Sequence, residues 1–346
     1  MYAIKSFSLK RVITYSGWHM LWLLLWAALV TILYEVSNWQ WFFIPWLPLS
    51  VIGTAVAFYV GFKNNQSYSR LWEARKIWGA IVNSSRSWGA AVKAFVNDHD
   101  LDEHISQEEL LAVWRPLLYR HIGWLYALRS QLLVATPWEH GRKRFQIGEV
   151  VLERDKIFGH TMVEDEVTIT HLKKLLPESE YESLIGFRNT ATQMIDLQAQ
   201  EISRLKAAGY LNEYSHVELQ RILGEFYVHQ GKCERIKKFP LPRQYASMSM
   251  IFVGIFIFLL PFGMVAEFHD MIEGWGAWLG IPITALVGWV YLMMELVGGY
   301  SENPFEGLGN DIPMFALCRT IEIDLREMLG ETDLPPAVQA KNGILI

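Results

Sequence analysis

Three residues in one apolar segment have the spacing to act on a passing ion. Thr54, Phe58 and Phe62 recur at four-residue intervals, which places their side chains on one face of a helix. In a ring of identical subunits each position would become a ring of side chains, and rings of phenylalanine can gate ions by dewetting. Such a stripe is also typical of a membrane helix that packs against a neighbouring helix. The spacing therefore indicates either a pore constriction or a packing face.

The sequence offers little for catalysis or metal binding. None of the ten histidines forms a metal-ligand spacing, and Cys233 and Cys318 form neither a metal motif nor a disulfide framework. No glycine-rich phosphate loop, nucleophile elbow or pair of intramembrane carboxylates occurs. Glu295, near the end of an apolar segment, is expected to pair with a basic helix end. We therefore expect no catalytic residue, no metal and no cofactor, and a protein that is not an enzyme.

Four segments are long and apolar enough to cross a bilayer, which needs about 20 apolar residues. Tryptophan and tyrosine gather at their ends, as in the aromatic belt of a membrane interface. A re-entrant pair made by the first two segments is the alternative. The first segment continues too far for a cleavable signal peptide and indicates an anchor. The four segments are Trp18 to Val36, Trp41 to Phe62, Tyr245 to Phe268 and Trp275 to Tyr300.

Lysine and arginine are distributed unevenly among the loops. They cluster before the first segment, after the second and before the third, and they are absent from residues 37–40 and 267–276. The positive-inside rule then places both termini and the middle of the chain in the cytosol. We predict a multi-pass protein in contact with membrane lipid. The net charge of -5 leaves no basic excess for a nucleic-acid partner.

The segment between the second and third spans indicates amphipathic helices. Apolar residues recur at three- and four-residue spacing over Gln107 to Leu133, where Pro116 leaves a start near Ala112 as an alternative. The pattern repeats over Glu180 to Ala208 and over Val217 to Phe239. None of these helices has an apolar run of membrane length, so we expect them to bundle in the cytosol.

Two stretches lack this periodicity. His140 to His171 is polar and β-branched, and indicates a short hairpin or an inserted loop. The tail from Asp333 to Ile346 is expected to be extended or disordered. The predicted domains are 1–62 with the first two spans, 63–243 as a helical cytosolic domain with an insertion near 140–171, 244–300 with the last two spans, and 301–346 as a cytosolic C-terminal segment.

The second span continues into charged sequence without a helix breaker. The run from Gly61 to Arg86 (GFKNNQSYSRLWEARKIWGAIVNSSR) resembles the signature of the bacterial branch of the bestrophin family. Pro240 to Arg243 (PLPR) agrees with it, and Glu302 to Phe305 (ENPF) resembles the family's Asn-Pro-Phe motif. The resemblance covers about Ser6 to Glu331. The insertion near 140–171 has no counterpart that we can place in the family.

The resemblance implies an all-α membrane protein of the cell inner membrane, with both termini in the cytosol. It would be a homopentamer with four transmembrane helices per subunit, a large helical cytosolic domain and five second spans around a central pore. Arg70 and Trp72 match the family's Arg-Trp-Trp element, and anchoring on them assigns the apolar neck to Thr54, Phe58 and Phe62. Thr54 departs from the pattern, because the family usually has a bulky apolar residue there.

The resemblance implies a second constriction at the cytosolic end of the pore. This aperture lies near the turn AAGYLNE, with Leu211 as its candidate and Tyr210 as the next, and packing of Leu211 within the bundle is the alternative.

The resemblance also bears on calcium binding. Animal members bind calcium through a run of aspartates after Asn-Pro-Phe. Here Glu306 and Asp311 are separated by glycines, and calcium needs six to eight oxygen ligands. We therefore expect no calcium gate, and the motif here indicates a turn that ends the fourth span.

The function that these observations favour is a passive ion channel for chloride or other small anions. A channel of the same fold for monovalent cations, sodium or potassium, is the alternative. A secondary transporter fits less well, because transporters are built from inverted repeats and no internal repeat occurs. A membrane enzyme is disfavoured by the missing catalytic motifs.

Overall fold

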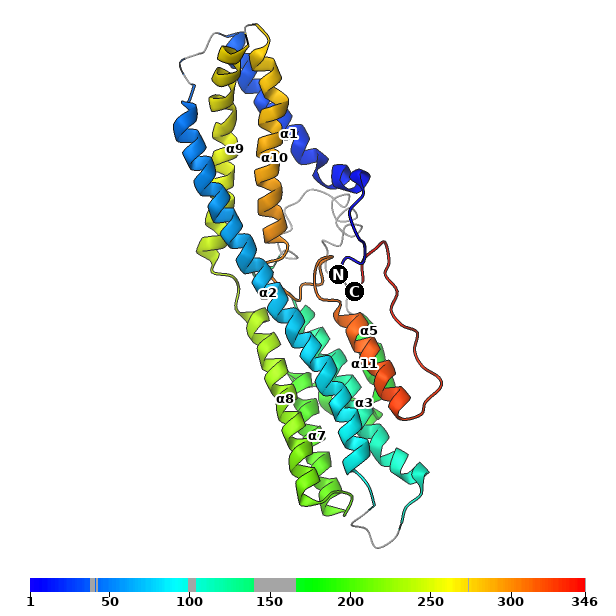
Figure 1. The fold of residues 1–346 in the computed structure, drawn as a ribbon. Helices are drawn as coiled ribbons and strands as arrows, with labels where there is room; N and C mark the ends of the chain where they lie inside the picture. The colour runs from blue at the N-terminus through cyan, green and yellow to red at the C-terminus, as the bar shows by residue number, and fades with distance from the viewer. Residues whose placement is uncertain (38–40, 42, 99–103, 140–165, 273, 346) are drawn as a thin grey trace. The chain divides into compact units, whose positions relative to one another are not determined.

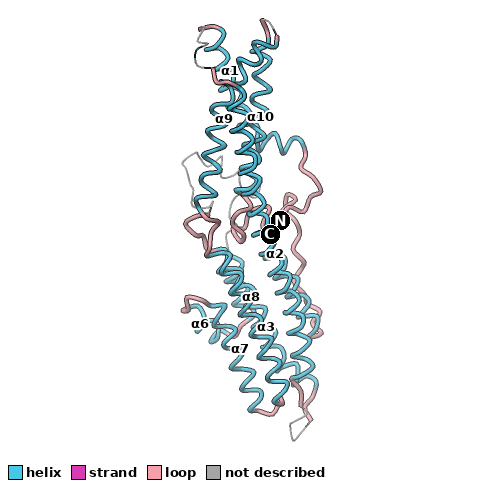
Figure 2. Tube along the Cα trace, turned by 60° about the vertical axis from the view of Figure 1, so that its left-hand side comes forward, coloured by secondary structure: helices cyan, strands magenta, loops and turns pink. Residues whose placement is uncertain are grey.

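The computed structural model describes residues 1–37, 41, 43–98, 104–139, 166–272 and 274–345. Within these ranges the regular structure is helical, and extended pairing is limited to isolated bridges (Figure 2). The helices are α1 (Leu9–Glu35), α2 (Trp46–Phe95), α3 (Gln107–Leu133), α5 (Glu166–Leu175), α6 (Glu178–Ile185), α7 (Thr190–Ala207), α8 (Glu213–Lys238), α9 (Arg243–Met271), α10 (Gly276–Gly299) and α11 (Met314–Met328). They form two compact units.

The first unit comprises Ile4–Leu71 and Pro240–Asn303. It holds α1, the first part of α2, α9 and α10, and α1, α9 and α10 lie side by side in it (Figure 1). Among the described residues, four helices are long and apolar enough to cross a membrane, and they are α1, α2, α9 and α10. These correspond to the four predicted spans. We call this unit the membrane unit.

The second predicted span starts later than expected. Its helix begins at Trp46 rather than at Trp41. Pro45 is the reason, because a proline has no N–H for the helix ladder and disfavours helical backbone at the residue before it. The first helix begins earlier, at Leu9, where the Ser8 hydroxyl caps it by accepting a hydrogen bond from the Arg11 N–H at 3.4 Å.

The predicted continuity of the second span is confirmed. α2 runs for 50 residues without interruption. At 1.5 Å per residue it is about 75 Å long, more than twice the thickness of a bilayer core. No proline follows Pro48 in this helix, and its charged second part consists largely of residues that tolerate helical backbone.

The second unit comprises Met1–Ala3, Trp72–Phe239 and Pro304–Ile346. α3 lies against α7, α5 and α11, and α7 lies against α8. α3 begins at Gln107, because Ser106 and Glu109 form a reciprocal capping box there. The alternative start near Ala112 is therefore wrong. We call this unit the cytosolic unit, after its predicted side of the membrane.

The helix predicted over Glu180 to Ala208 is two helices. α6 ends at Ile185, and α7 begins at Thr190 after the Asn189 side chain accepts a hydrogen bond from the Thr192 N–H at 3.0 Å. Gly186 and the asparagine cap that follows it outweigh the apolar periodicity that runs through them. The single-helix prediction was wrong for this local reason.

Residues 140–165, most of the predicted insertion, lie outside the described residues, and Glu166–His171 belong to α5. The C-terminal tail is extended. Its Gly343 and Leu345 exchange backbone hydrogen bonds of 2.8 Å with Ala3 and Met1. Each unit combines segments from both ends of the chain, and the four-part domain division stays a prediction.

A candidate pore-lining face and the charges behind it

One face of α2 is uncovered in the membrane unit. Phe58 is 82% exposed and Phe62 is 52% exposed, although both are large apolar side chains. Thr54 is also exposed, and its hydroxyl donates a hydrogen bond of 2.9 Å to the Ser50 carbonyl of its own helix. The predicted stripe is therefore one contiguous outward face. We call Thr54, Phe58 and Phe62 the α2 stripe.

The opposite face of α2 is built into the unit's core. Val56 and Val60 are buried and pack in one apolar cluster with residues of α9 and α10 such as Phe256. The Tyr291 hydroxyl donates a hydrogen bond of 3.0 Å to the Gly53 carbonyl. A Cβ at Gly53 would lie 2.8 Å from the Phe256 ring, so only glycine allows the ring this close approach. These residues, and not Phe58, form the face of α2 that packs on α9 and α10, whereas the half-exposed Phe62 ring also lies 6.1 Å from the Tyr245 ring of α9.

Buried charges stand beside this core. Lys63 and Glu295 form an ion pair in which the side chains are only 4% and 2% exposed. The Ser249 hydroxyl donates to the second oxygen of Glu295. Lys63 also lies 3.9 Å from Glu302, which accepts two hydrogen bonds from Arg243 at 3.1 and 3.2 Å. Negative and positive side chains therefore alternate in space, in the order Glu295, Lys63, Glu302 and Arg243.

The sequence pointed to only part of this arrangement. Glu295 was expected to pair with a basic helix end, and its partner is instead Lys63, in the middle of α2. The missed signal was the position of Lys63 on the helix. It lies three residues after Val60 and seven after Val56, which is the spacing of the buried face and not of the exposed one.

The predicted aperture residue occupies a different environment. Leu211 follows the turn at Gly209, where φ is 86°, and its side chain is only 4% exposed within its own subunit. Tyr214, three residues further on, is 88% exposed. The Asn97 N–H donates a hydrogen bond of 3.1 Å to the Tyr210 carbonyl, which holds the turn against the end of α2. An aperture role for Leu211 stays a prediction.

The segment after the fourth span forms a tight turn in the cytosolic unit. Phe305 is buried with a φ of 73°. The Asp311 carboxylate accepts hydrogen bonds from the Gly307 and Ile312 N–H groups at 2.9 and 2.7 Å. Burial raises the pKa of Asp311 above its ordinary value, and the backbone donors oppose that rise. Among the described residues, no group of three or more His, Cys, Asp or Glu could hold a metal ion.

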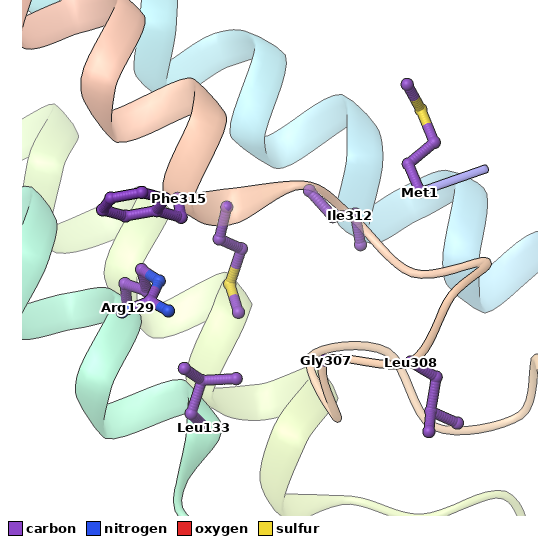
Figure 3. A pocket seen from close by; sticks show the side chains of 8 residues that line it. Met1, Arg129, Leu133, Gly307, Leu308, Ile312 and Phe315 are labelled. Carbon is purple, nitrogen blue, oxygen red and sulfur yellow. The ribbon is translucent and has the colours of Figure 1, made fainter. Parts of the chain in front are cut away.

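A small cavity lies beside this turn. It has a volume of about 20 Å³, which is enough for about one water molecule. The Arg129 guanidinium lies 5.2 Å from the centre of the Phe315 ring at its wall. A space of this size does not carry ions through the subunit. Figure 3 shows its lining, which is Met1, Arg129, Leu133, Gly307, Leu308, Ile312, Met314 and Phe315.

Four helices of membrane length among the described residues, one of them a continuous helix of 50 residues, define the class as a multi-pass membrane protein. The model of the family described as Bacterial/Fungal Bestrophin protein matches residues 5–327. The chain therefore belongs to this bestrophin family, as its sequence motifs predicted.

Similar proteins and solved structures support this family assignment. The chain is 25% identical over 307 residues to the voltage-dependent anion channel-forming protein YneE of Escherichia coli K12, covering 86% of this chain and 84% of the relative. It is 27% identical over 300 residues to a voltage-dependent anion channel-forming protein of Ralstonia nicotianae, covering 86% and 82%. A crystal structure of a bacterial bestrophin homologue from Klebsiella pneumoniae has the same fold, with a TM-score of 0.72, 23% identity and coverage of 91% and 98%.

Proposed function

We propose that the protein is a passive ion channel of the bestrophin type that conducts chloride or other small anions. It works as a homopentamer, and five α2 helices line its central pore with the α2 stripe as the neck. The observation that carries this proposal is the exposure of Phe58, which is 82% in the single subunit while the opposite face of the same helix is locked in the core.

A lone subunit in a bilayer would cover its exposed apolar side chains with lipid, at no cost in burial. On a wide, water-filled pore, each large apolar side chain would instead forgo about 1.5–3 kcal/mol of burial free energy. Around a narrow five-fold axis, Phe58 and Phe62 of neighbouring subunits would face each other across the axis. An ion that passes such a ring loses hydration without gaining ligands, and this makes the ring a barrier.

The charge along α2 favours anions. Lys76 lies 18 residues after Phe58, which is five full helical turns and therefore the same face. It is exposed, and it has no ion-pair partner among the described residues. A ring of five such lysines would raise the local anion concentration on the cytosolic side of the neck. The two compared relatives are named as anion channel-forming proteins, which agrees with this sign.

The remaining parts of the proposal are the assembly and its setting. The protein resides in the cell inner membrane, its partners are lipid, its own copies and small monovalent ions, and both termini lie in the cytosol. Light scattering of the detergent-solubilised protein tests the assembly. A mass of five chains is expected after subtraction of detergent, and a monomer or dimer would contradict the pore arrangement.

Current across a planar bilayer tests the function. Purified protein is recorded in a tenfold gradient of potassium chloride with no added energy source, and protein-free vesicles fused in the same way are the control. We expect unitary currents that reverse near the chloride equilibrium potential, which is about 59 mV from zero and opposite in sign to the potassium equilibrium potential. Reversal near the potassium potential would replace the proposal with the cation channel, and the absence of unitary currents would refute a channel.

A further inference from the structure

Four charged residues contact one another beside α2, of which Lys63, Glu295 and Glu302 are buried and Arg243 is 40% exposed. Lys63 belongs to α2, Glu295 to α10 and Arg243 to α9, and Glu302 lies just after α10. Glu295 contacts Lys63, and Glu302 lies between Lys63 and Arg243. The alternating chain therefore joins three helices of the membrane unit through directional contacts. We call these four residues the charge chain.

Burial makes the Lys63–Glu295 contact obligatory. A charge removed from water is tolerated only when it is paired and hydrogen-bonded, and removal of one partner of a buried pair is strongly destabilising. The Ser249 hydroxyl on α9 occupies the other Glu295 oxygen. Lys63 therefore cannot swing toward the exposed side of α2 without leaving Glu295 uncompensated.

A second polar contact between α2 and α10 lies next to the Lys63–Glu295 pair. The Asn64 side chain donates a hydrogen bond of 2.9 Å to the Met294 carbonyl, beside Glu295. A Cβ at Gly298 would overlap the Asn64 amide oxygen, so only a glycine at this position of α10 leaves room for the Asn64 side chain. Two consecutive residues of α2 are thus held by α10 through polar contacts.

The neighbouring apolar contacts do not supply this restraint. Val56 and Val60 are buried, but hydrophobic contact is non-directional and tolerates a modest rotation of the helix. Hydrogen bonds and close ion pairs weaken steeply when their angle or distance changes. Lys63 follows Phe62 directly, so about 100° of helical rotation separates their side chains. A fixed Lys63 therefore fixes the direction of Phe62.

We propose that the charge chain, through the Lys63–Glu295 pair, is the positioning device that sets the rotation of α2 and so aims the α2 stripe. The proposal rests on the proposed function, in which that stripe lines the pore. Lys63 and Glu295 touch no ion in this arrangement. They act through Phe58 and Phe62, and loss of the pair would turn the neck rings away from the axis.

Thiol labelling of the full-length assembled protein tests the rotation. Phe62→Cys reports the exposed face and Val60→Cys reports the buried one, and the native Cys233 and Cys318 are buried and give a low background. With the pair intact we expect a charged, water-soluble thiol reagent to modify the Phe62→Cys variant at least about tenfold faster than the Val60→Cys variant, because thiol reactivity follows exposure.

The test variants change the pair and keep the charges balanced. Lys63→Met combined with Glu295→Gln leaves no uncompensated charge, so the protein should still assemble. In this background we expect the ratio of labelling rates to fall toward one. The swap of Lys63→Glu with Glu295→Lys, combined with Glu302→Gln so that the new carboxylate has no like charge beside it, should restore most of the ratio. The exposed Arg221–Glu218 pair on α8, swapped in the same way, is the matched control and should leave the ratio unchanged.

An unchanged ratio in the Lys63→Met and Glu295→Gln double variant would overturn the proposal, because the pair would then serve stability alone. A fall in the ratio that the charge swap fails to restore at all, in an assembled protein, would also count against it. Labelling needs no ion current, so a protein that conducts no ions would refute the proposed function without changing this readout.

Discussion

Phe58 and Tyr59 are consecutive residues of α2 with opposite surroundings. Phe58 is largely exposed, whereas the Tyr59 ring lies edge-on to Phe252 of α9 at 5.3 Å between centres and stacks with Tyr245 at 6.3 Å. A rotation of α2 by one residue would exchange these environments. The proposed pore-lining face is therefore defined to within a single residue, and neighbouring positions serve as controls for each other.

The top of the α2 stripe should respond to added apolar bulk. Thr54 is exposed and its hydroxyl donates a hydrogen bond to the Ser50 carbonyl, so in the proposed pore its methyl group and its small size would set the width of the ring at this position. Thr54→Ile would complete a third bulky apolar ring. We expect it to reduce the current by about twofold or more, measured as unitary conductance and open probability, because a longer dry stretch raises the barrier.

Thr54→Ser is the matched control, since it keeps the hydroxyl and removes only a methyl group. Its current should equal that of the wild type or exceed it. An unaltered current in Thr54→Ile, together with normal assembly, would show that position 54 lies outside the constriction.

Leu211 is predicted to narrow the cytosolic end of the pore. Leu211→Ala should then raise conductance, and burial of the side chain in its own subunit adds a loss of about 2–5 kcal/mol in unfolding free energy. Tyr214→Ala, at the exposed start of α8, should change neither. A loss of stability in Leu211→Ala with unaltered conductance would show that Leu211 only packs the bundle.

Conduction should not depend on calcium. The turn after the fourth span carries Glu306 and Asp311 without the aspartate run, and Asp311 is already engaged by backbone N–H groups. Chelation of calcium on both sides of the bilayer should leave open probability unaltered. Loss of current on chelation, and its recovery when micromolar calcium is restored, would reveal a site that these residues do not account for.

The cytosolic unit should lose stability in mild acid because of one histidine. His121 is buried against Phe226 and Trp124, and burial lowers its pKa to about 3 from 6.5. Ser85 donates its hydroxyl hydrogen to the Ile81 carbonyl, so the neutral ring donates from Nε2 to Ser85 at 2.9 Å. The unfolded chain binds a proton below pH 6.5 and the folded chain does not. The stabilisation is therefore complete above pH 6.5 and is lost progressively down to about pH 3.

At pH 5 this difference amounts to about 2 kcal/mol. His121→Gln keeps a donor for Ser85 and does not titrate, so its melting temperature should fall less between pH 7 and pH 5 than that of the wild type. Parallel pH profiles for the two proteins would contradict the assignment of a neutral buried imidazole.

The sequence predicted the helices through features that are local or periodic. Span length, helix continuity after Pro48 and the apolar spacing of α3 and α8 each follow from neighbouring residues. Apolar periodicity runs through the break between α6 and α7 and predicts one helix there, and only the local signals of Gly186 and Asn189 indicate the break. The start of α2 at Trp46 is similar, because hydropathy predicts a start at Trp41 and only Pro45 indicates the later one.

Local and periodic features of the sequence could not predict the Lys63–Glu295 pair. Lys63 and Glu295 are 232 residues apart in the sequence, and only the packing of α2 against α10 makes them partners. Helical spacing placed the α2 stripe on one face, but it left open which face was exposed. The contacts of Val56, Val60 and Gly53 with α9 and α10 settled that question within the subunit.

Single-channel recording of three alanine variants tests the proposed pore most directly. Phe58→Ala and Phe62→Ala should each raise open probability or unitary conductance by about twofold or more, because truncation lowers the apolar barrier. Tyr59→Ala should lower thermal stability, by loss of its aromatic contacts with α9, and leave conduction nearly unchanged. Unaltered conduction in both phenylalanine variants, with a changed conduction in Tyr59→Ala, would show that another face of α2 lines the pore.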